Sequence, residues 1–553
     1  MTDYKIIGEI LIGENLNLSL REPAEYYELV EKLRLLYREE YSPNERIIIH
    51  LVADVYDYPG RPGKILTLIQ KAINELDISN CFVLIRSGNE RLDKEVVWLA
   101  DNLSHDKTPM NFEILDEEFG YHPKFRKVDN YNDTAPIKID VDSLSEKHKD
   151  LLTKNSSFCI YPWIHLHSFP TGEAQVCCMT EYNEPVGNLR EQTMQEVWNG
   201  DKMKEIRRNM LAGLPNASCA RCYEQEKSGF MSGRISANKH HGHHIERVEE
   251  TKSDGSFDRF EMTYWDIRFS NLCNLSCRSC GHIYSSSWYQ DQVKLAGKQW
   301  GEKHKPLFWA GRYETDMLEQ LMEHIDYVEQ IYFAGGEPLM MDEHYQILEE
   351  LERRGKFNVR LIYNTNFTKT KLKDRYVFDY WRKFDSVAVG ASLDAMGERA
   401  EYIRKGTKWE EVENNRRMMM EQCPNVDFYI SPTLSIMNAL HLPDFHKNWV
   451  EKGLIKPMDL NVNILQDPPY YRIDIAPDHY KQKIIEKFEE HLRWLRPLDP
   501  FKRATKGFES SLNFLKSENK QILLPKFWEK TNQLDGFRKE NILEIIPELN
   551  ELR

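Results

Sequence analysis

Apolar positions recur along the chain in short runs, and their alternation with helical patterns predicts the central part of the fold. Between Trp265 and about Ile475 the runs "YWDIRFS", "VEQIYFAGG", "VRLIYNTN", "SVAVGASLD", "VDFYISPTLS" and "DLNVNILQD" are typical of buried strands. Most of them are followed by a helical segment or by a connection long enough to cross over a sheet. The pattern therefore predicts an α/β fold whose parallel sheet curves toward a barrel.

A second alternating region lies upstream, at roughly residues 1 to 140. There, β-branched runs such as "ERIIIHLVADVYDY" alternate with amphipathic segments such as "GKILTLIQKAINEL", which predicts a small α/β domain. Its "YPGRPGK" contains Gly60, Gly63 and Lys64, but a P-loop needs four residues between the glycines and a Ser or Thr after the lysine. We interpret this stretch as a turn that feeds a helix.

Polar segments separate these regions. Residues 155 to 235 combine short strand and turn patterns, and "KHHGHHIERVEETKSDGSFDR" then has the polarity of a connector. We interpret its histidines as an exposed loop rather than a metal site, because histidine runs in polar segments are more often solvated. These histidines are His240, His241, His243 and His244. After Pro477 the chain is charged and helical, as in "HYKQKIIEKFEEHLRWL".

Composition narrows the classes of protein to consider. A chain of 553 residues is long enough for two to four domains. The net charge of -14 argues against a nucleic-acid surface. No run reaches the roughly 18 to 20 apolar residues of a membrane span, and the first residues lack the order of a signal peptide. We therefore expect a soluble, cytoplasmic protein.

Cysteines gather in one part of the chain. Eight of the ten lie between Cys159 and Cys280, and in a reducing compartment such crowding favours metal binding or catalysis over disulfides. Cys273, Cys277 and Cys280 follow the first predicted barrel strand as C-x3-C-x2-C. With His282 they would make a zinc site of three thiolates and one imidazole. A [4Fe-4S] cluster on three cysteines would instead leave one iron open to an outside ligand.

Polar side chains also follow the later predicted strands. "FAGGEPLM" ends the second strand, "YNTNFT" the third and "ASLDA" the fourth. Active sites of β/α barrels gather at the carboxyl ends of their strands, so we expect these residues to lie near the three cysteines. A zinc ribbon would not require this series.

The upstream cysteines form a second set. Cys159 and Cys177 are followed by Cys219 and Cys222, and four thiolates in two groups suit either a zinc site or an iron–sulfur cluster equally well. Cys178, next to Cys177, is an alternative ligand or a spare thiol.

The motif "CNLSCRSC" followed by "GGEP" resembles the radical S-adenosylmethionine (SAM) superfamily. The resemblance implies a partial (β/α)6 barrel in which the three cysteines hold a [4Fe-4S] cluster whose open iron is chelated by SAM. It assigns the SAM amino group to Gly335, Gly336 and Glu337, the ribose or methionine moiety to Ser392 and Asp394, the carboxylate to Arg404, and the pocket wall to Asn366. Where the family has an aromatic residue before its third cysteine this chain has Ser279, so Tyr284 is a candidate for packing on the adenine.

The spacing C-x12-G-x4-C with a later C-x2-C resembles a twitch domain, the shortened relative of the SPASM domain that binds an auxiliary [4Fe-4S] cluster. This spacing fits Cys177 rather than Cys178. We expect an N-terminal α/β domain at residues 1–145, a twitch domain at 150–250, the radical SAM core at 260–475 and a helical extension at 476–553. In most such enzymes this module follows the barrel, whereas here it precedes it.

The resemblance also implies a reaction. An electron from a flavodoxin or ferredoxin would cleave SAM to a 5'-deoxyadenosyl radical, which abstracts a hydrogen from a substrate, while the auxiliary cluster transfers electrons. By family analogy the substrate is a peptide or protein, or a small molecule such as a sugar-type precursor. The alternative is a non-catalytic scaffold in which zinc holds both cysteine sets, but a scaffold has no need of "GGEP". A radical methyltransferase is a third possibility, although no separate cobalamin-binding pattern is present.

Overall fold

The structure is a computed structural model that describes residues 141–180, 184–227, 232–499, 502–517 and 519–553, together with three upstream strands. The chain divides into two compact units, residues 1–134 and 135–553. In the first unit, β1 (Lys5–Ile12), β2 (Glu45–Val52) and β3 (Cys81–Arg86) form a parallel sheet in that order. The helices predicted between them, and Gly60, Gly63 and Lys64, lie outside the described residues.

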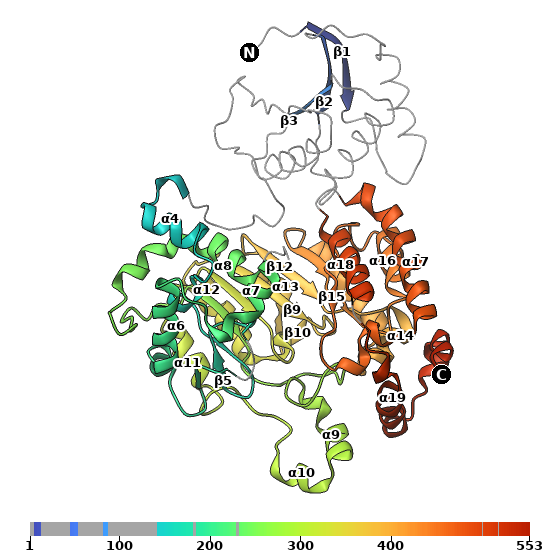
Figure 1. The fold of residues 1–553 in the computed structure, drawn as a ribbon. Coiled ribbons are helices and arrows are strands. Elements are labelled where there is room, and N and C mark those ends of the chain that lie inside the picture. The colour runs from blue at the N-terminus through green and yellow to red at the C-terminus, as the bar shows by residue number, and fades with distance from the viewer. Residues whose placement is uncertain are drawn as a thin grey trace. The chain divides into compact units, whose positions relative to one another are not determined.

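The second unit is built on a parallel sheet whose strands follow their order in the chain (Figure 1). Its strands are β7 (Tyr264–Ile267), β8 (Gln330–Phe333), β9 (Arg360–Thr365), β12 (Val387–Ala391) and β13 (Asp427–Ile430). A parallel bridge from Ile430 to Leu460 and the parallel pair β14 (Thr433–Leu434) and β15 (Asn463–Ile464) add a sixth position. All six predicted strands are confirmed, and together they make a partial (β/α)6 barrel.

Helices cross between these strands, as parallel pairing requires. The main ones are α11 (Asp316–Met322), α12 (Asp342–Arg353), α13 (Val377–Trp381), α14 (Gly397–Ile403), α15 (Trp409–Gln422) and α16 (Leu442–Glu451). In α12, Tyr345, Leu348 and Leu351 recur every three residues and are fully buried against the sheet. The long β7–β8 connection carries α9 (Tyr289–Ala296) and α10 (Lys298–Lys303), and a small ribbon follows β9: β10 (Lys371–Leu372) and β11 (Arg375–Tyr376).

The cysteine-rich segment continues the same sheet beyond β7. β4 (His167–Ser168) is parallel to β7 through the pair His167 and Asp266, and β5 (Glu173–Gln175) and β6 (Gly187–Asn188) follow as antiparallel strands. Its helices are α4 (Glu146–Thr153), α5 (Met194–Trp198), α6 (Asp201–Leu211), α7 (Ala220–Lys227) and α8 (Gly233–His241). The short strands confirm the strand and turn prediction, whereas the helices exceed it.

The prediction that "KHHGHHIERVEETKSDGSFDR" is a polar connector is wrong for its first half. The segment forms the end of α8 and then a 3-10 helix, η5 (Gly242–Glu250), in which Ile245, Arg247 and Val248 are buried. Arg247 is paired inside the protein, where its Nη1 donates to the Glu261 carbonyl at 2.8 Å. Asn238, just before the segment, likewise donates from Nδ2 to the Phe158 carbonyl at 3.0 Å. Polar composition therefore did not mean that the whole segment is exposed, because a buried polar group such as the Arg247 guanidinium has partners inside the protein.

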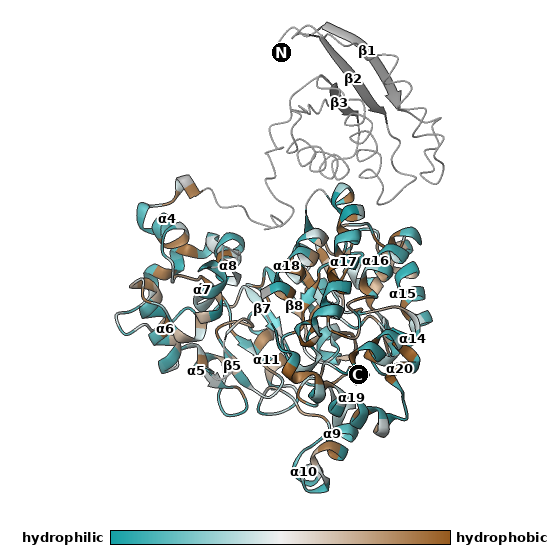
Figure 2. Cartoon of the chain, turned by 45° about the vertical axis from the view of Figure 1, so that its right-hand side comes forward, coloured by the Kyte–Doolittle hydropathy of each residue, from teal (hydrophilic) through white to brown (hydrophobic). Residues whose placement is uncertain are grey.

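The C-terminal region is helical, as predicted, with α17 (Asp478–Leu495), α18 (Arg503–Ser517), α19 (Leu524–Arg538) and α20 (Ile542–Ile545). Figure 2 shows hydrophobic positions along one side of such helices, and in α17 Tyr480, Ile484, Phe488 and Leu492 recur every four residues and are buried. None of the described helices has the length and the apolarity that crossing a membrane demands.

Candidate active site

The loop after β7 carries Cys273, Cys277 and Cys280 at the carboxyl end of the sheet. Buried polar groups fix its path. The Asn271 amide donates to the His282 carbonyl at 2.9 Å and to the Pro306 carbonyl at 3.0 Å, and Trp288 Nε1 donates to the Cys277 carbonyl at 2.8 Å. These bonds hold the three thiols on a rigid loop.

The C-terminal helix α19 braces the same loop from outside. Arg538 Nη2 donates to the Ser276 carbonyl at 2.8 Å, while the buried guanidinium of Arg278 pairs with Asp535 and, at 2.7 Å, with Glu540. Arg278 also lies over the Tyr402 ring, 3.7 Å from its centroid. Sequence reasoning missed this brace, because its partners are more than 250 residues apart.

Burial and the guanidinium of Arg404 determine how the pKa values of the three barrel-loop thiols are shifted. Burial raises the pKa of Cys280 to about 12 and also raises the pKa values of Cys273 and Cys277. The guanidinium of Arg404 opposes this at Cys277, because its Nη1 lies 3.8 Å from the Cys277 sulfur. A bound metal centre would favour the thiolates in the same way.

Arg404 is held in place by Asp394. Two guanidinium nitrogens donate to the two carboxylate oxygens at 2.8 and 2.9 Å, and the backbone N–H of Thr433 donates to Asp394 at 2.8 Å. Asp394 is buried and its oxygens are occupied, so in this structure it orients Arg404.

The "GGEP" turn packs directly against the cysteine loop. The Glu337 N–H donates to the Leu272 carbonyl at 2.7 Å. A Cβ at Gly336 would lie 2.1 Å from that same oxygen, and Gly335 has a φ of 112°, which favours glycine. Only glycines allow the second strand end to approach the residue before Cys273 this closely.

The side chain of Glu337 is fully buried and accepts three hydrogen bonds. The donors are the Thr365 hydroxyl at 2.6 Å, the Asn366 N–H at 2.7 Å and the Leu339 N–H at 3.1 Å. Burial raises its pKa to about 7, although these donors favour the ionised form. Thr365 is a site residue that the sequence interpretation did not include.

Asn366 reaches the cysteines as well. Its amide nitrogen lies 2.9 Å from Asn274 Oδ1 and 3.8 Å from the Cys273 sulfur. Ser392 follows β12, and its N–H donates to the Thr365 carbonyl at 2.8 Å. Among the hydrogen bonds of the described residues, none joins the Ser392 side chain to this group. Gly335, Gly336, Glu337, Asn366, Asp394 and Arg404 thus surround the cysteine loop, with Ser392 at the neighbouring strand end.

His282 faces away from the sulfurs. Its Nε2 lies 3.2 Å from the Pro306 carbonyl, and its ring packs edge-on against Trp300 and Phe308. The zinc site of three thiolates and His282 therefore does not form in this geometry. Tyr284 lies edge-on to Phe169, with ring centroids 6.4 Å apart. Its packing on adenine stays a prediction.

The upstream cysteines come together around Cys159. Burial raises the pKa of the Cys159 thiol, and the nearby thiols of Cys177, Cys219 and Cys222 raise it further. Hydroxyl groups flank this set: the Cys177 sulfur lies 3.6 Å from the Thr180 hydroxyl.

Cys178 belongs to different surroundings. Burial raises its pKa, the carboxylate of Asp266 raises it further, and the guanidinium of Arg268 opposes this. Asp266 is buried on β7, lies 3.1 Å from His167 Nδ1 and accepts from Arg268 Nε at 3.3 Å. An acidic residue inside the buried strand "YWDIRFS" is the sequence signal that could have revealed this polar group.

The spacing of the sulfurs tests which metal centre fits. One tetrahedral zinc ion with sulfur ligands at about 2.3 Å would hold its ligands about 3.8 Å apart. In the part of the chain that the structure describes, no three cysteine sulfurs lie within 4.8 Å of one another. As placed here, neither set has the spacing of the ligands of one bound zinc ion, and soft thiolates are also the ligands that iron–sulfur clusters take.

Comparisons with known proteins agree with this arrangement. Residues 159–223 match the SPASM model, described as an iron–sulfur cluster-binding domain, and residues 267–432 match the radical SAM superfamily. No curated protein matches the chain.

Solved structures of anSMEcpe are similar to parts of the chain. The native protein with bound AdoMet and the Kp18Cys peptide is 20% identical, with a TM-score of 0.31 over 43% of this chain and 62% of that chain. The native protein with bound AdoMet is 21% identical, with a TM-score of 0.28 over 42% and 58%. The chain thus spans less than two thirds of those structures.

Proposed function

We propose that the chain is a radical SAM enzyme with two iron–sulfur centres whose three-cysteine loop binds SAM, because residues 267–432 match the radical SAM model and residues 159–223, ahead of the barrel, match the SPASM model. When bound, the cluster and SAM supply a carbon-centred radical that takes a hydrogen atom from the substrate. The observation that carries the proposal is the convergence of the cysteine loop, the "GGEP" turn and Arg404 at one sheet edge.

We assign Cys273, Cys277 and Cys280 to the SAM-binding [4Fe-4S] cluster. The loop offers three thiols, and His282, which would be the fourth ligand of a closed site, is turned toward a backbone carbonyl. An open coordination position is what a site for an exogenous amino acid group requires.

Arg404 is placed to receive the carboxylate of SAM. It is a cation beside the Cys277 sulfur, and Asp394 holds its guanidinium plane through two hydrogen bonds. Glu337, beside Gly335 and Gly336, is the candidate acceptor for the SAM amino group. A carboxylate has about four acceptor positions, and protein donors occupy three of those on Glu337. Asn366 would form the pocket wall, and Ser392 would contact the ribose or methionine moiety.

The upstream set, Cys159, Cys177, Cys219 and Cys222, is the candidate ligand set of the auxiliary [4Fe-4S] cluster. Cys178 faces Asp266 instead, which supports Cys177 as the ligand. Four thiolates leave no open position for substrate, so we assign this centre to electron transfer. The electron donor would be a flavodoxin or ferredoxin.

The substrate we propose is a peptide or protein, or a small molecule such as a sugar-type precursor. His167 on β4, Asp266 on β7 and Arg268 just after β7 offer groups of both charges near Cys178, which suits a polar substrate. We propose the domain boundaries expected from the sequence, which are 1–145, 150–250, 260–475 and 476–553. Variants within each domain can then test which domain recognises the substrate.

Anaerobic reconstitution tests the proposal directly. The protein should contain about 8 iron atoms per chain, and with SAM and dithionite it should release 5'-deoxyadenosine, measured by liquid chromatography and mass spectrometry. Bound zinc without iron, together with no 5'-deoxyadenosine, would support the zinc-binding scaffold instead.

A further inference from the structure

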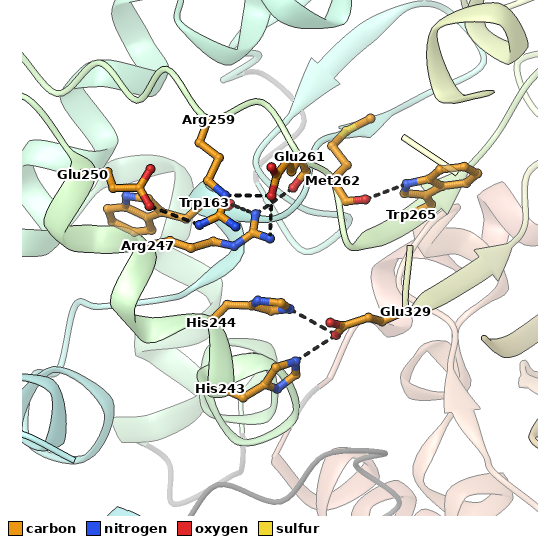
Figure 3. Close-up of polar contacts among 10 residues, drawn as sticks. All are labelled: Trp163, His243, His244, Arg247, Glu250, Arg259, Glu261, Met262, Trp265 and Glu329. Carbon is orange, nitrogen blue, oxygen red and sulfur yellow. Dashed lines mark hydrogen bonds and ion pairs between the residues drawn. The ribbon is translucent and has the colours of Figure 1, made fainter. Parts of the chain in front are cut away.

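Two histidines of η5 face a carboxylate at the opposite edge of the sheet from the cysteine loop. His243 and His244 lie in the first turn of η5, and Glu329 stands just before β8, at the amino end of that strand (Figure 3). The Glu329 backbone is fixed by the sheet, because its N–H donates to the Thr263 carbonyl at 2.9 Å and its carbonyl accepts from the Arg360 N–H at 2.9 Å. The prediction of an exposed histidine loop is therefore wrong for this pair.

Both imidazoles converge on one oxygen atom. His243 Nε2 lies 2.8 Å from Glu329 Oε2, and His244 Nε2 lies 3.1 Å from the same atom. Successive residues of a 3-10 helix point about 120° apart, yet these two rings lie side by side with centroids 4.1 Å apart. Their convergence indicates a shared centre rather than two separate contacts.

The spacing is close to that of a metal site. The three ligand atoms all lie within 4.8 Å of one another. Zinc holds imidazole nitrogen and carboxylate oxygen at about 2.0 to 2.2 Å in a tetrahedron, which separates ligand atoms by about 3.4 Å. The nitrogens and the oxygen would need to move apart by only a few tenths of an ångström to admit an ion.

Burial and charge favour a cation. The side chains of His243, His244 and Glu329 are 14%, 12% and 29% exposed, so the group is shielded but reachable. Nearby cations are paired elsewhere: Arg247 and Arg259 both contact Glu261, and Arg259 also contacts Glu250 (Figure 3). Within the described residues, the ion pairs of Glu329 are those with the two histidines, so no lysine or arginine there forms an ion pair with its carboxylate.

We propose that His243, His244 and Glu329 bind one divalent transition-metal ion, best matched by Zn²⁺, with water completing its coordination. Two imidazoles and a carboxylate are a recognised three-residue zinc ligand set. The ion joins η5, which follows the cysteine-rich segment, to the amino end of a barrel strand. Its role is to fasten these two parts together, and it shares no residue with either cysteine set.

The test uses the anaerobically reconstituted full chain, in which iron–sulfur clusters occupy the cysteines, after EDTA treatment and buffer exchange. Titration with Zn²⁺ in a calorimeter should show one equivalent bound by the wild type. His243→Ala and Glu329→Gln should each weaken this binding by about 100-fold or more, and Zn²⁺ should raise the unfolding temperature of the wild type but not of these variants.

His240→Ala is the matched control, because His240 belongs to the same histidine run but contacts Ser236. It should bind Zn²⁺ like the wild type. Cluster absorbance near ~400 nm, unchanged in every variant, shows that the fold is retained. The absorption spectrum of bound Co²⁺ is a second measurement, because it distinguishes nitrogen and oxygen ligands from thiolates. It should show nitrogen and oxygen ligands. Equal Zn²⁺ binding by the wild type and Glu329→Gln, or no binding by the wild type, would overturn the proposal.

Discussion

The two cysteine sets differ in what lies beside their sulfur atoms. In the barrel loop a guanidinium lies 3.8 Å from the Cys277 sulfur and an amide lies 3.8 Å from the Cys273 sulfur. In the upstream set the closest side-chain partners are hydroxyls, at 3.6 Å from Cys177 and 4.0 Å from Cys219. The sulfurs of the barrel loop therefore lie beside groups able to bind a charged ligand, whereas hydroxyls are the partners of Cys177 and Cys219 in the upstream set.

The difference teaches how similar ligands are given different tasks. Three thiols with a cation and a carboxylate nearby make a site that remains open to an amino acid such as the methionine part of SAM. Four thiols, of which Cys159 and Cys222 are buried, are enough to fill the ligand positions of a closed centre. The number of cysteines decides how many positions are filled, and the neighbouring charges decide what fills the rest.

Removing one cysteine from either set is expected to change iron content and SAM cleavage more than any other substitution. The two variants should lose the same amount of iron but differ in SAM cleavage. Cys277→Ala should abolish 5'-deoxyadenosine formation while keeping about 4 iron atoms. Cys222→Ala should also keep about 4 iron atoms, but it should still cleave SAM. Iron content and product are measured on the same samples. If both variants lost SAM cleavage equally, the division of tasks would be wrong.

The next effect concerns the contact between "GGEP" and the cysteine loop. Gly336→Ala places a Cβ within 2.1 Å of the Leu272 carbonyl, so the backbone must shift, and we expect a loss of more than about 2 kcal/mol in the free energy of unfolding. Gly281→Ala is the control, because a Cβ there meets no atom within 4 Å. Denaturant unfolding under anaerobic conditions measures both. Equal stability of the two variants would contradict the close contact.

Arg404→Lys tests the role of the cation beside Cys277 without removing a sulfur ligand. Lysine keeps the charge but cannot form the paired hydrogen bonds to Asp394, so the cation loses its orientation. We expect the KM for SAM to rise about 10-fold to 100-fold, equivalent to roughly 1.4 to 2.7 kcal/mol, with iron content unchanged. Asp394→Asn should produce the same trend. An unchanged KM in both variants would remove Arg404 from the SAM site.

The smallest expected effect is a pH dependence that belongs to the barrel site alone. The pKa of Glu337 is raised to about 7 by burial, so the ionised form that would accept the SAM amino group becomes scarcer as pH falls below 7. The KM for SAM should rise toward 10-fold per pH unit in that range. Glu337→Gln should flatten the profile. In the wild type, a KM that stays constant from pH 8 to pH 6 would exclude this role.

The raised pKa of Glu337 also makes the stability of the fold depend on pH. A carboxyl group whose folded pKa lies above its unfolded value favours folding below the unfolded pKa, near 4.5, and loses that contribution as pH rises toward about 7. Stability and SAM binding should therefore depend on Glu337 in opposite directions across this window. Measuring both on one preparation separates ligand binding from folding.

The barrel was predictable because its signals are local. Each strand appears as an apolar run, and the cysteine spacing and "GGEP" stand in short windows at predicted strand ends. The six strands and the clustering of Glu337, Asn366 and Arg404 around the cysteine loop follow from the rule that parallel strands end at one edge.

What could not be predicted depends on contacts between distant residues. The burial of His243 and His244 follows from Glu329, which lies 85 residues beyond His244. Asp394 was expected at the ribose or methionine moiety, whereas in the structure its oxygens bind Arg404 and Thr433. A side chain's partner decides its role, and partners across a fold leave no periodic trace in the sequence.

The brace of the cysteine loop by α19 sets an order for maturation. Synthesis proceeds from the amino end, so the loop of Cys273, Cys277 and Cys280 leaves the ribosome long before Asp535, Arg538 and Glu540 exist to fix it. Until then the buried Arg278 lacks its carboxylates and the Ser276 carbonyl lacks its donor. We therefore expect iron loading of the barrel site to follow synthesis of residues more than 250 positions downstream of the loop, whereas the candidate ligands of the upstream centre are complete at Cys222.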